Sequence, residues 1–214
     1  MRGGDEQVKT GRTYDASSRR EQAEQRRLAT LEVAREAFLG DGYAATTVDA
    51  VATTAGVSAA TIYKTYGGKA GLMRAVCQRA LEGTGPVPAE ERSDALRANV
   101  DGQTLIAAWG TLTAEVAPRV APVMLLLADA AISDPEAATL LDEIEANHLA
   151  RMQDNAEFFA RAGHLRRGVT VKEARDVMWF CTSPELYDLL VVRRNWTRKR
   201  FAAFITQTLA AALL

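Results

Sequence analysis

The sequence predicts an all-α protein, with a small N-terminal helix-turn-helix domain followed by a larger C-terminal helical domain. Alanine, leucine, glutamate and arginine dominate the 214 residues, and runs of the β-branched and aromatic residues that form strands are scarce. Apolar residues recur at helical spacing along most of the chain. A stretch at 83–91 with two glycines and two prolines interrupts this pattern. We therefore expect an arm at 1–18, a helix-turn-helix domain at 19–82 and a second helical domain at 92–214.

The charge is divided unevenly along the chain. Residues 1–80 carry 12 Lys and Arg against 9 Asp and Glu, a net charge of +3. The remainder carries 14 basic against 18 acidic residues, a net charge of −4. A basic front and an acidic back suit a DNA-binding head on a body that does not touch DNA. An excess of three charges is also small enough to arise by chance.

The first segment, residues 1–18, is polar, contains glycine and lacks periodicity, so we expect an arm without regular structure. Ser17 or Ser18 can cap the first helix, which runs to about Leu39 and stops at Gly40. Its start carries four arginines, which are either a solvated charge cluster or a set of phosphate contacts. These are Arg19, Arg20, Arg26 and Arg27.

The central stretch, residues 46–76, reads as two short helices joined by a tight turn and followed by a third helix. Thr46 or Thr47 can cap the first of them through its hydroxyl. Gly56 tolerates the left-handed conformation that ends a helix, and Ser58 can cap the next one. A turn of three to four residues with glycine between two small helices is typical of a helix-turn-helix, whose second helix enters the major groove.

The outward side chains of that second helix suit contact with DNA. Ala59, Ala60 and Thr61 are small, so the backbone can approach base edges closely, and a threonine hydroxyl serves either base type. Hydroxyl and ammonium donors gather at its C-terminal edge, as phosphate contacts require. They are Tyr63, Lys64, Tyr66 and Lys69.

The stretch T-T-V-D-A-V-A-T-T-A-G-V-S-A-A-T-I-Y at 46–63, with the tyrosine, lysine and leucine that follow, resembles the DNA-binding domain of tetracycline-repressor (TetR) type regulators. The match is ungapped over 46–72, and residues 33–43 resemble the end of that family's first helix. The resemblance implies phosphate contacts by five residues, namely Thr47, Ser58, Tyr63, Lys64 and Lys69. It also implies that Ala59, Ala60 and Thr61 face the bases. Because two of these are alanines, hydrogen-bond discrimination between sequences should be weak, and Gly67-Gly68 makes the following loop looser.

Beyond the third helix of the stretch, the periodicity predicts seven further helices. Proline is comfortable only in a first helical turn, so Pro118 and Pro122 should separate two of them. Ser-Pro and Asp-Pro pairs, a cap followed by proline, should begin two others. The expected ranges are 93–100, 101–116, 122–132, 135–162, 170–180, 185–194 and 197–213.

In the resembled family the second domain encloses a pocket for a small, usually apolar ligand and dimerises through its last two helices. The resemblance thus implies that some large apolar side chains, with a polar anchor, line a pocket; plain core packing is the competing interpretation. Candidate pocket residues are Trp109, Met124, Met152, Phe159, Met178, Trp179, Glu185 and Tyr187. Candidate residues of the homodimer interface are Leu186, Leu189, Leu190, Phe201, Phe204, Ile205 and Leu209.

The C-terminal half contains no recognised catalytic motif. His148 and His164 do not have metal-ligand spacing, and Cys77 and Cys181 form no C-x-x-C pair, so we expect no metal, no cofactor and reduced cysteines. We find neither a signal segment nor an apolar run long enough to span a membrane, which predicts a cytoplasmic protein without a membrane partner.

The expected function is a homodimeric repressor that a small apolar effector releases from a palindromic site on double-stranded DNA. Two alternatives remain open at this point. One is a ligand-independent dimeric regulator whose second domain only dimerises. The other is an all-helical enzyme with an incidental helix-turn-helix, which the absence of catalytic spacing disfavours.

Overall fold

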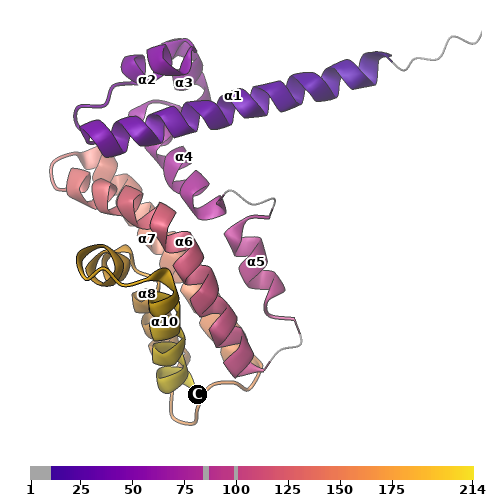
Figure 1. The fold of residues 1–214 in the computed structure, drawn as a ribbon, viewed down its shortest axis with the longest axis vertical. Coiled ribbons are helices and arrows are strands. Elements are labelled where there is room, and N and C mark those ends of the chain that lie inside the picture. Colours follow the sequence, from indigo (N-terminus) through magenta and orange to yellow (C-terminus); the bar gives the residue numbers. More distant parts are fainter. Residues whose placement is uncertain (1–10, 84–86, 99–100) are drawn as a thin grey trace, which may run out of the picture.

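The computed structural model describes residues 11–83, 87–98 and 101–214, with side chains from residue 18 onward. Every regular element in this part of the chain is a helix, as the sequence predicts (Figure 1). The elements are α1 (Gly11–Asp41), α2 (Val48–Ala55), α3 (Ala59–Tyr66), α4 (Lys69–Glu82), α5 (Ala89–Ala95), α6 (Gly102–Ala131), α7 (Pro135–Arg161), α8 (Val171–Cys181), α9 (Pro184–Tyr187), the π-helix η1 (Asp188–Arg193) and α10 (Arg198–Leu213).

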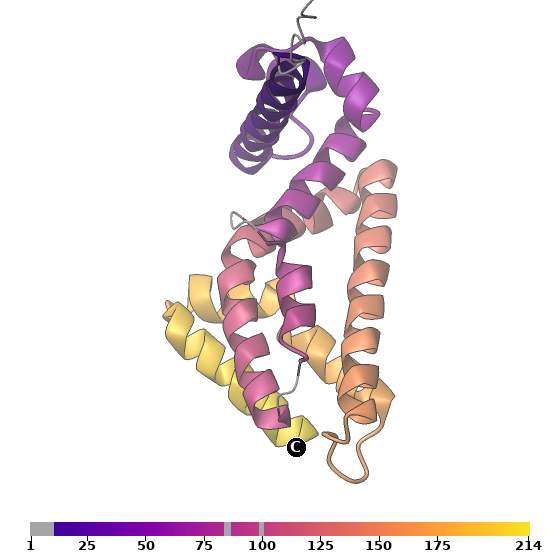
Figure 2. The ribbon, with the colours of Figure 1, turned by 90° about the vertical axis from the view of Figure 1, so that its right-hand side faces the viewer.

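Helices α1–α4 form a head at one end of the molecule, and α6–α10 form an elongated body below it (Figures 1 and 2). The predicted arm is wrong where it can be checked, because residues 11–18 are already helical. Residues 1–10 lie outside the described residues. The residues that follow, 19–27, are all Arg, Glu, Gln or Ala, which are strong helix formers and need no apolar partner to stay helical. The head's helix therefore extends well beyond the head.

Two separate clusters of buried side chains hold the molecule together. The head core joins α1–α4 to the adjoining ends of α6 and α7, and includes Leu31, Phe38, Ile62, Met73, Leu127 and Leu140. The C-terminal core joins α6, α7, α8 and α10, and includes Leu105, Trp109, Phe159, Met178, Phe201 and Ile205. Helix α6 contributes to both clusters, so it connects the head to the far end of the body.

The predicted break between helices at 101–116 and 122–132 is wrong, because α6 runs without interruption through Pro118 and Pro122. The two prolines lie four residues apart, so the N–H that Pro122 lacks would have bonded the carbonyl of Pro118, on the same side of the helix. Packing against α4, α7, α9 and α10 holds the helix continuous. Helix α6 is also long and apolar enough, by length and composition alone, to cross a membrane. Within the described chain it contacts α4, α7, α9 and α10.

The short helix α5 corrects a second prediction. It begins after Pro88 and ends at Ala95, whereas the sequence suggested a helix capped by Ser93. Ser93 lies inside the helix and is 8% exposed. Proline before the first helical residue, followed by Glu90 and Glu91 in the first turn, starts this helix earlier, because acidic groups favour the positive end of the helix dipole.

The starts of α7, α8 and α10 agree with the expected ranges, and each rests on a side-chain cap. The Asp134 carboxylate accepts from the Glu136 and Ala137 amides, and Thr170 forms a capping box with Glu173. Thr197 caps α10 through the amide of Arg200. The segment from Pro184 to Arg193 is helical as expected, but its second part is a π-helix. Both cysteines are free and buried, and burial raises the pKa of each thiol to about 12.

Candidate nucleic-acid interface

The α2–α3 pair is held by the two caps and the glycine that the sequence indicated. The Thr47 hydroxyl accepts a hydrogen bond from the Ala50 amide at 3.1 Å. Gly56 ends α2 with φ 66° and ψ 31°, a left-handed conformation that glycine adopts without penalty. The Ser58 hydroxyl then accepts from the Thr61 amide at 3.1 Å and starts α3. The two helices are thus fixed at a turn typical of a helix-turn-helix.

Helix α3 buries one side chain and presents the others. Ile62 is 1% exposed and packs in the head core, whereas Tyr63 is 54% exposed. Ala60, Thr61 and Lys64 are also exposed, and Ala59 is half-buried. The face of α3 that points to solvent is therefore the one expected to face DNA, and it is small in the middle and polar toward the C-terminus.

The hydroxyl of Thr61 is already oriented by its neighbour. Its Oγ1 lies 2.8 Å from the Oγ of Ser58, which also caps the helix. A hydroxyl can donate one hydrogen bond and accept two, so this contact leaves Thr61 able to bond a base edge. The two predicted DNA-contacting residues thus form a coupled pair, in which a change of Ser58 would also release Thr61.

Helix α3 ends at Tyr66, which is followed by two glycines. Burial raises the pKa of the half-buried Tyr66 phenol, while the nearby Arg27 guanidinium lowers it and Glu24 raises it. Tyr66 therefore keeps its proton at neutral pH and can act as a donor. The two glycines that follow have φ values of 80° and 134°, which side chains rarely adopt, so Gly67-Gly68 is required by the backbone.

Lys69, a predicted phosphate contact, is tied into the head itself. Its Nζ donates to the carbonyl oxygen of Ala44 at 3.1 Å and lies 4.4 Å from the centroid of the Tyr43 ring. This side chain fastens the start of α4 to the connection between α1 and α2. An ammonium group has three donors, so a phosphate could still be bound by the remaining two.

Gly71 is a residue of this site that the sequence interpretation did not single out. A Cβ at this position would lie 1.7 Å from the carbonyl oxygen of Tyr66, a distance that backbone atoms cannot accept. Only glycine lets the first turn of α4 pass so close to the end of α3. A helical glycine in the pattern K-A-G-L was the one available signal, since glycine inside a helix otherwise costs stability.

The predicted pocket residues do not all meet. Five lie together in the C-terminal core, namely Trp109, Met152, Phe159, Met178 and Tyr187. Met124 packs on the head core instead. Trp179 and Glu185 are exposed at the surface of α8 and α9. The pocket itself stays a prediction.

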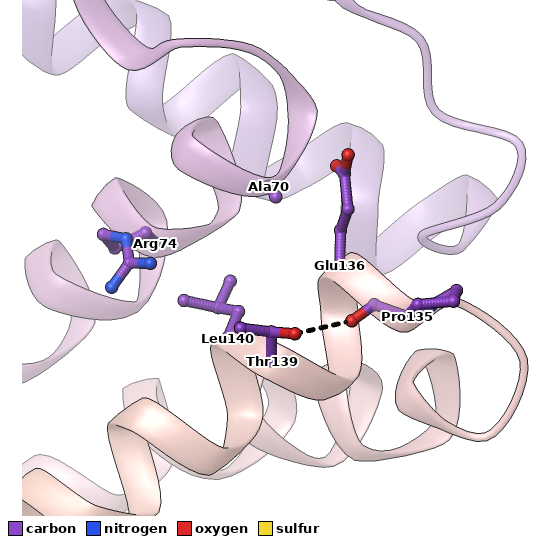
Figure 3. A pocket seen from close by; sticks show the side chains of 6 residues that line it. All are labelled: Ala70, Arg74, Pro135, Glu136, Thr139 and Leu140. Carbon is purple, nitrogen blue, oxygen red and sulfur yellow. Dashed lines mark hydrogen bonds between the residues drawn. The ribbon is translucent and has the colours of Figure 1, made fainter.

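One open cleft of about 350 Å³ lies elsewhere, between the first turns of α4 and α7 (Figure 3). Two of its lining residues, Ala70 and Arg74, come from the head, and four come from the first turns of α7. None of the predicted pocket residues lines it. Beside the cleft, Arg74 forms an ion pair with Glu143 of α7. The cleft therefore marks the junction between head and body.

The predicted dimer residues also separate, and several are corrected. Phe201, Ile205 and Leu209 are 0–3% exposed because that face of α10 packs on α6 in the same subunit, and Leu186 is 7% exposed. Leu189 is 50% exposed. Leu190 and Phe204 are half-buried. A strongly apolar face on a helix does not indicate which neighbour covers it, and here α6 of the same chain does.

Comparison with known proteins agrees with this geometry. Residues 31–76 match the family described as bacterial regulatory proteins, tetR family. No match was found among curated protein sequences.

Solved structures share the fold at low sequence identity. FadR of Bacillus subtilis in complex with stearoyl-CoA has a TM-score of 0.68 at 18% identity, covering 87% of this chain and 99% of that one. NalD of Pseudomonas aeruginosa, the secondary repressor of the MexAB-OprM multidrug efflux pump, has a TM-score of 0.68 at 19% identity, covering 89% and 98%. A structure described as a TetR-family transcriptional regulator of Syntrophomonas wolfei has a TM-score of 0.66 at 18% identity, covering 90% and 98%. The helix-turn-helix head therefore carries a segment of the tetR family of bacterial regulatory proteins, and the chain shares the fold of solved structures described as TetR-family regulators.

Proposed function

We propose that this regulator is a cytoplasmic homodimeric repressor, which a small apolar effector releases from a palindromic operator. Two copies of α3, one per subunit, would enter major grooves about 34–36 Å apart. Because the DNA fixes that distance, a small change in the spacing of the two heads would lower the affinity. The effector acts only to the extent that it binds the two arrangements differently.

The observation that carries this proposal is the position of α6. This helix supplies Leu105 and Trp109 to the C-terminal core and Leu127 to the head core. A ligand that separated side chains of the C-terminal core would have to displace α6, and α6 cannot move without the head core. The effector site and the DNA-reading helix would thus be linked by one rigid element.

Trp109 supports an effector site within that core. Its side chain is 6% exposed and its ring packs on Phe159, with 6.0 Å between centroids. Its indole Nε1 finds no acceptor among the residues that the structure describes. Leaving a buried donor unsatisfied costs about 1–3 kcal/mol. An apolar ligand that carries one hydrogen-bond acceptor, such as a carbonyl oxygen, would satisfy it.

The descriptions of two similar structures are consistent with an apolar effector. FadR of Bacillus subtilis is seen with stearoyl-CoA, which carries a long acyl chain. NalD represses a multidrug efflux pump. Since identity to both is below one fifth, the ligand class is proposed for this chain on the basis of its own core and not transferred.

The homodimer is proposed on the surface that the subunit leaves uncovered. Opposite its buried face, α10 presents Ala203, Gln207 and Ala211 at four-residue spacing, and the two alanines allow a second helix to approach closely. Beside it, the π-helix leaves Leu189 and Val192 50% and 58% exposed. These five residues define the outer face of the last two helices, which we propose as the two-fold contact.

A second candidate function is a dimeric regulator that needs no effector. It is favoured by the position of the cleft in Figure 3, which lies outside the buried side chains of the C-terminal core. In that case the C-terminal domain would serve only for dimerisation.

A ligand screen separates the two candidates. Long-chain acyl-CoAs and apolar drugs would be added while the melting temperature and the retardation of an operator duplex are recorded. An effector must raise the melting temperature by mass action and lower the DNA affinity. Trp109→Phe should weaken that response, whereas Trp179→Phe, at an exposed position, should not. If none of these compounds changes either quantity, the ligand-independent regulator is the better description.

A further inference from the structure

The N-terminal half of α1 does not pack against the other helices of the head. Helix α1 begins at Gly11, and its first part projects beyond α2–α4 into solvent (Figure 1). Every side chain from Arg19 to Arg26 is exposed, and full burial begins only at Thr30 and Leu31. Burial of apolar surface therefore does not explain this extension.

The charges on the extension are segregated around the helix. At about 100° per residue, Arg19 and Arg26 lie seven positions apart on one stripe, and Arg20 and Arg27 lie on the stripe beside it. Glu24 is neutralised by Arg27, which donates to it at 2.8 and 2.9 Å. One broad side of the extension is thus basic.

This basic side continues the face by which α1 packs on the head. Arg26 precedes the buried Thr30 by four residues, and the Thr30 hydroxyl donates to its carbonyl oxygen. Arg27 precedes the buried Leu31 by the same spacing, so both stripes run on into the head core. Where α1 passes the head, the same face loses its protein neighbours and becomes basic.

The basic side is also connected to the DNA-reading helix. Arg27 lies close enough to the Tyr66 phenol, at the end of α3, to lower its pKa. Arg20 and Arg26 are exposed and form no ion pair with any residue from 18 onward in the described chain. Two arginines that form no ion pair with these residues therefore stand on the side that leads to α3.

We propose that the N-terminal half of α1 is a second DNA-contacting element, which binds phosphates of the duplex beyond the base pairs that α3 reads. The proposal rests on DNA binding by α2 and α3. In Figure 1 the extension points away from the side of the molecule that carries α8 and α10. In a dimer formed on that side, the two extensions would point outward along the duplex and lengthen the contacted site at both ends. Charge complementarity selects this partner, because duplex DNA carries one phosphate charge per about 1.7 Å of its axis.

The test compares two lengths of DNA. An operator would be selected by the wild-type protein from a randomised duplex pool and prepared at about 20 base pairs, enough for two adjacent major grooves, and with flanks of mixed sequence to about 40 base pairs. Wild-type protein should bind the longer duplex more tightly and with a steeper salt dependence. Arg20→Ala/Arg26→Ala should remove this gain, with the salt slope falling by about one unit per lost phosphate contact.

Two matched variants make the result specific. Arg20→Lys/Arg26→Lys keeps the charge and should keep the slope. Arg167→Ala/Lys172→Ala removes two exposed charges between α7 and the start of α8 and should not change either affinity. The melting temperature of the alanine variant should match that of wild type, since both arginines are exposed.

Each outcome is decisive. If the alanine variant binds both duplexes as wild type does, the extension does not contact DNA, and its basic side is left to solvent or to a protein partner. If wild-type protein retards no duplex even at low salt, the DNA-binding function itself fails, which is a different result. Equal losses on the short and the long duplex would also overturn the proposal, because the contact would then lie within the operator.

Discussion

Lys69 illustrates how one residue can serve both the fold and the site. Its spacing indicated a phosphate contact, and the structure adds a hydrogen bond to the Ala44 carbonyl and a position over the Tyr43 ring. A cation over an aromatic face contributes about 0.5–1 kcal/mol at an exposed site and about 2 kcal/mol where the pair is desolvated, and the Tyr43 ring is 3% exposed. The long-range contact could not be read from the sequence, because it joins residues 25 positions apart.

Gly71 leads to a prediction about stability. Gly71→Ala should destabilise the protein by about 1–3 kcal/mol or more, because the new Cβ would meet the Tyr66 carbonyl oxygen and neither backbone can yield. Gly40→Ala is the matched control, since that position is also in a helix and its Cβ would meet nothing within 4 Å. It should be neutral or stabilising by up to about 1 kcal/mol. Urea unfolding measures both, and equal effects would contradict the close approach.

At the scale of elements, His148 fastens α7 to the end of α8. Its Nε2 lies 2.8 Å from the Thr182 hydroxyl, and its ring lies 6.3 Å from that of Trp179. Burial lowers the pKa of His148, and the Glu185 carboxylate only partly opposes this. The imidazole is therefore neutral in the folded protein at a pH where part of the unfolded chain already carries the charge.

This shift predicts the pH dependence of stability. Below the ordinary histidine pKa of about 6.5, the unfolded chain binds more protons at this position, so stability is lost as the pH falls toward the lowered pKa of the folded state. Melting temperatures from pH 8 to pH 5 should show this loss. His148→Gln cannot take up the proton and should flatten that part of the curve. An unchanged curve would assign the dependence to other groups.

The outer face of α10 and the π-helix leads to a prediction about assembly. Leu189→Glu should convert a dimer to monomers in light scattering, because the charge would be placed in the proposed two-fold contact. Ile132→Glu is the control, since Ile132 is 83% exposed at the end of α6 and lies outside that face. Loss of the dimer with both variants, or with neither, would contradict the assignment of this surface.

At the scale of the whole molecule, the head and the body share a core. Val123 and Leu127 of α6 and Leu140 of α7 are at most 2% exposed within the head core. The Arg74–Glu143 ion pair joins α4 to α7 at the same junction. The predicted domains at 19–82 and 92–214 are therefore joined by buried apolar contacts, and the chain between them is not their only connection.

A core substitution on the body should consequently loosen the head. Leu127→Ala removes a fully buried side chain and should cost about 2–5 kcal/mol. Hydrogen exchange of the α2 and α3 amides should accelerate, although the substitution lies in α6. Leu149→Ala, at a 36% exposed position of α7, should stay within about 0.5 kcal/mol. Unchanged exchange in α2 and α3 would show that the head is stable by itself.

The sequence by itself determined the class of the fold and the local structure of the DNA-reading pair. Caps and the turn glycine of α2 and α3 act over a few residues, so Gly56 and Ser58 could be placed in advance and the cap of α2 narrowed to Thr46 or Thr47. The same holds for the Asp-Pro cap of α7 and for the starts of α8 and α10 at the expected positions.

Only the tertiary structure decided which neighbour each apolar face meets. Phe201, Ile205 and Leu209 form an apolar stripe that would suit a partner subunit equally well, yet α6 of the same chain covers it. Helix α6 likewise continues through two prolines because its neighbours hold it on several sides. The free energy of burial depends on the apolar area removed from water and not on which helix covers that area. Periodicity alone therefore cannot show whether a helix of the same chain or of a second subunit covers an apolar face.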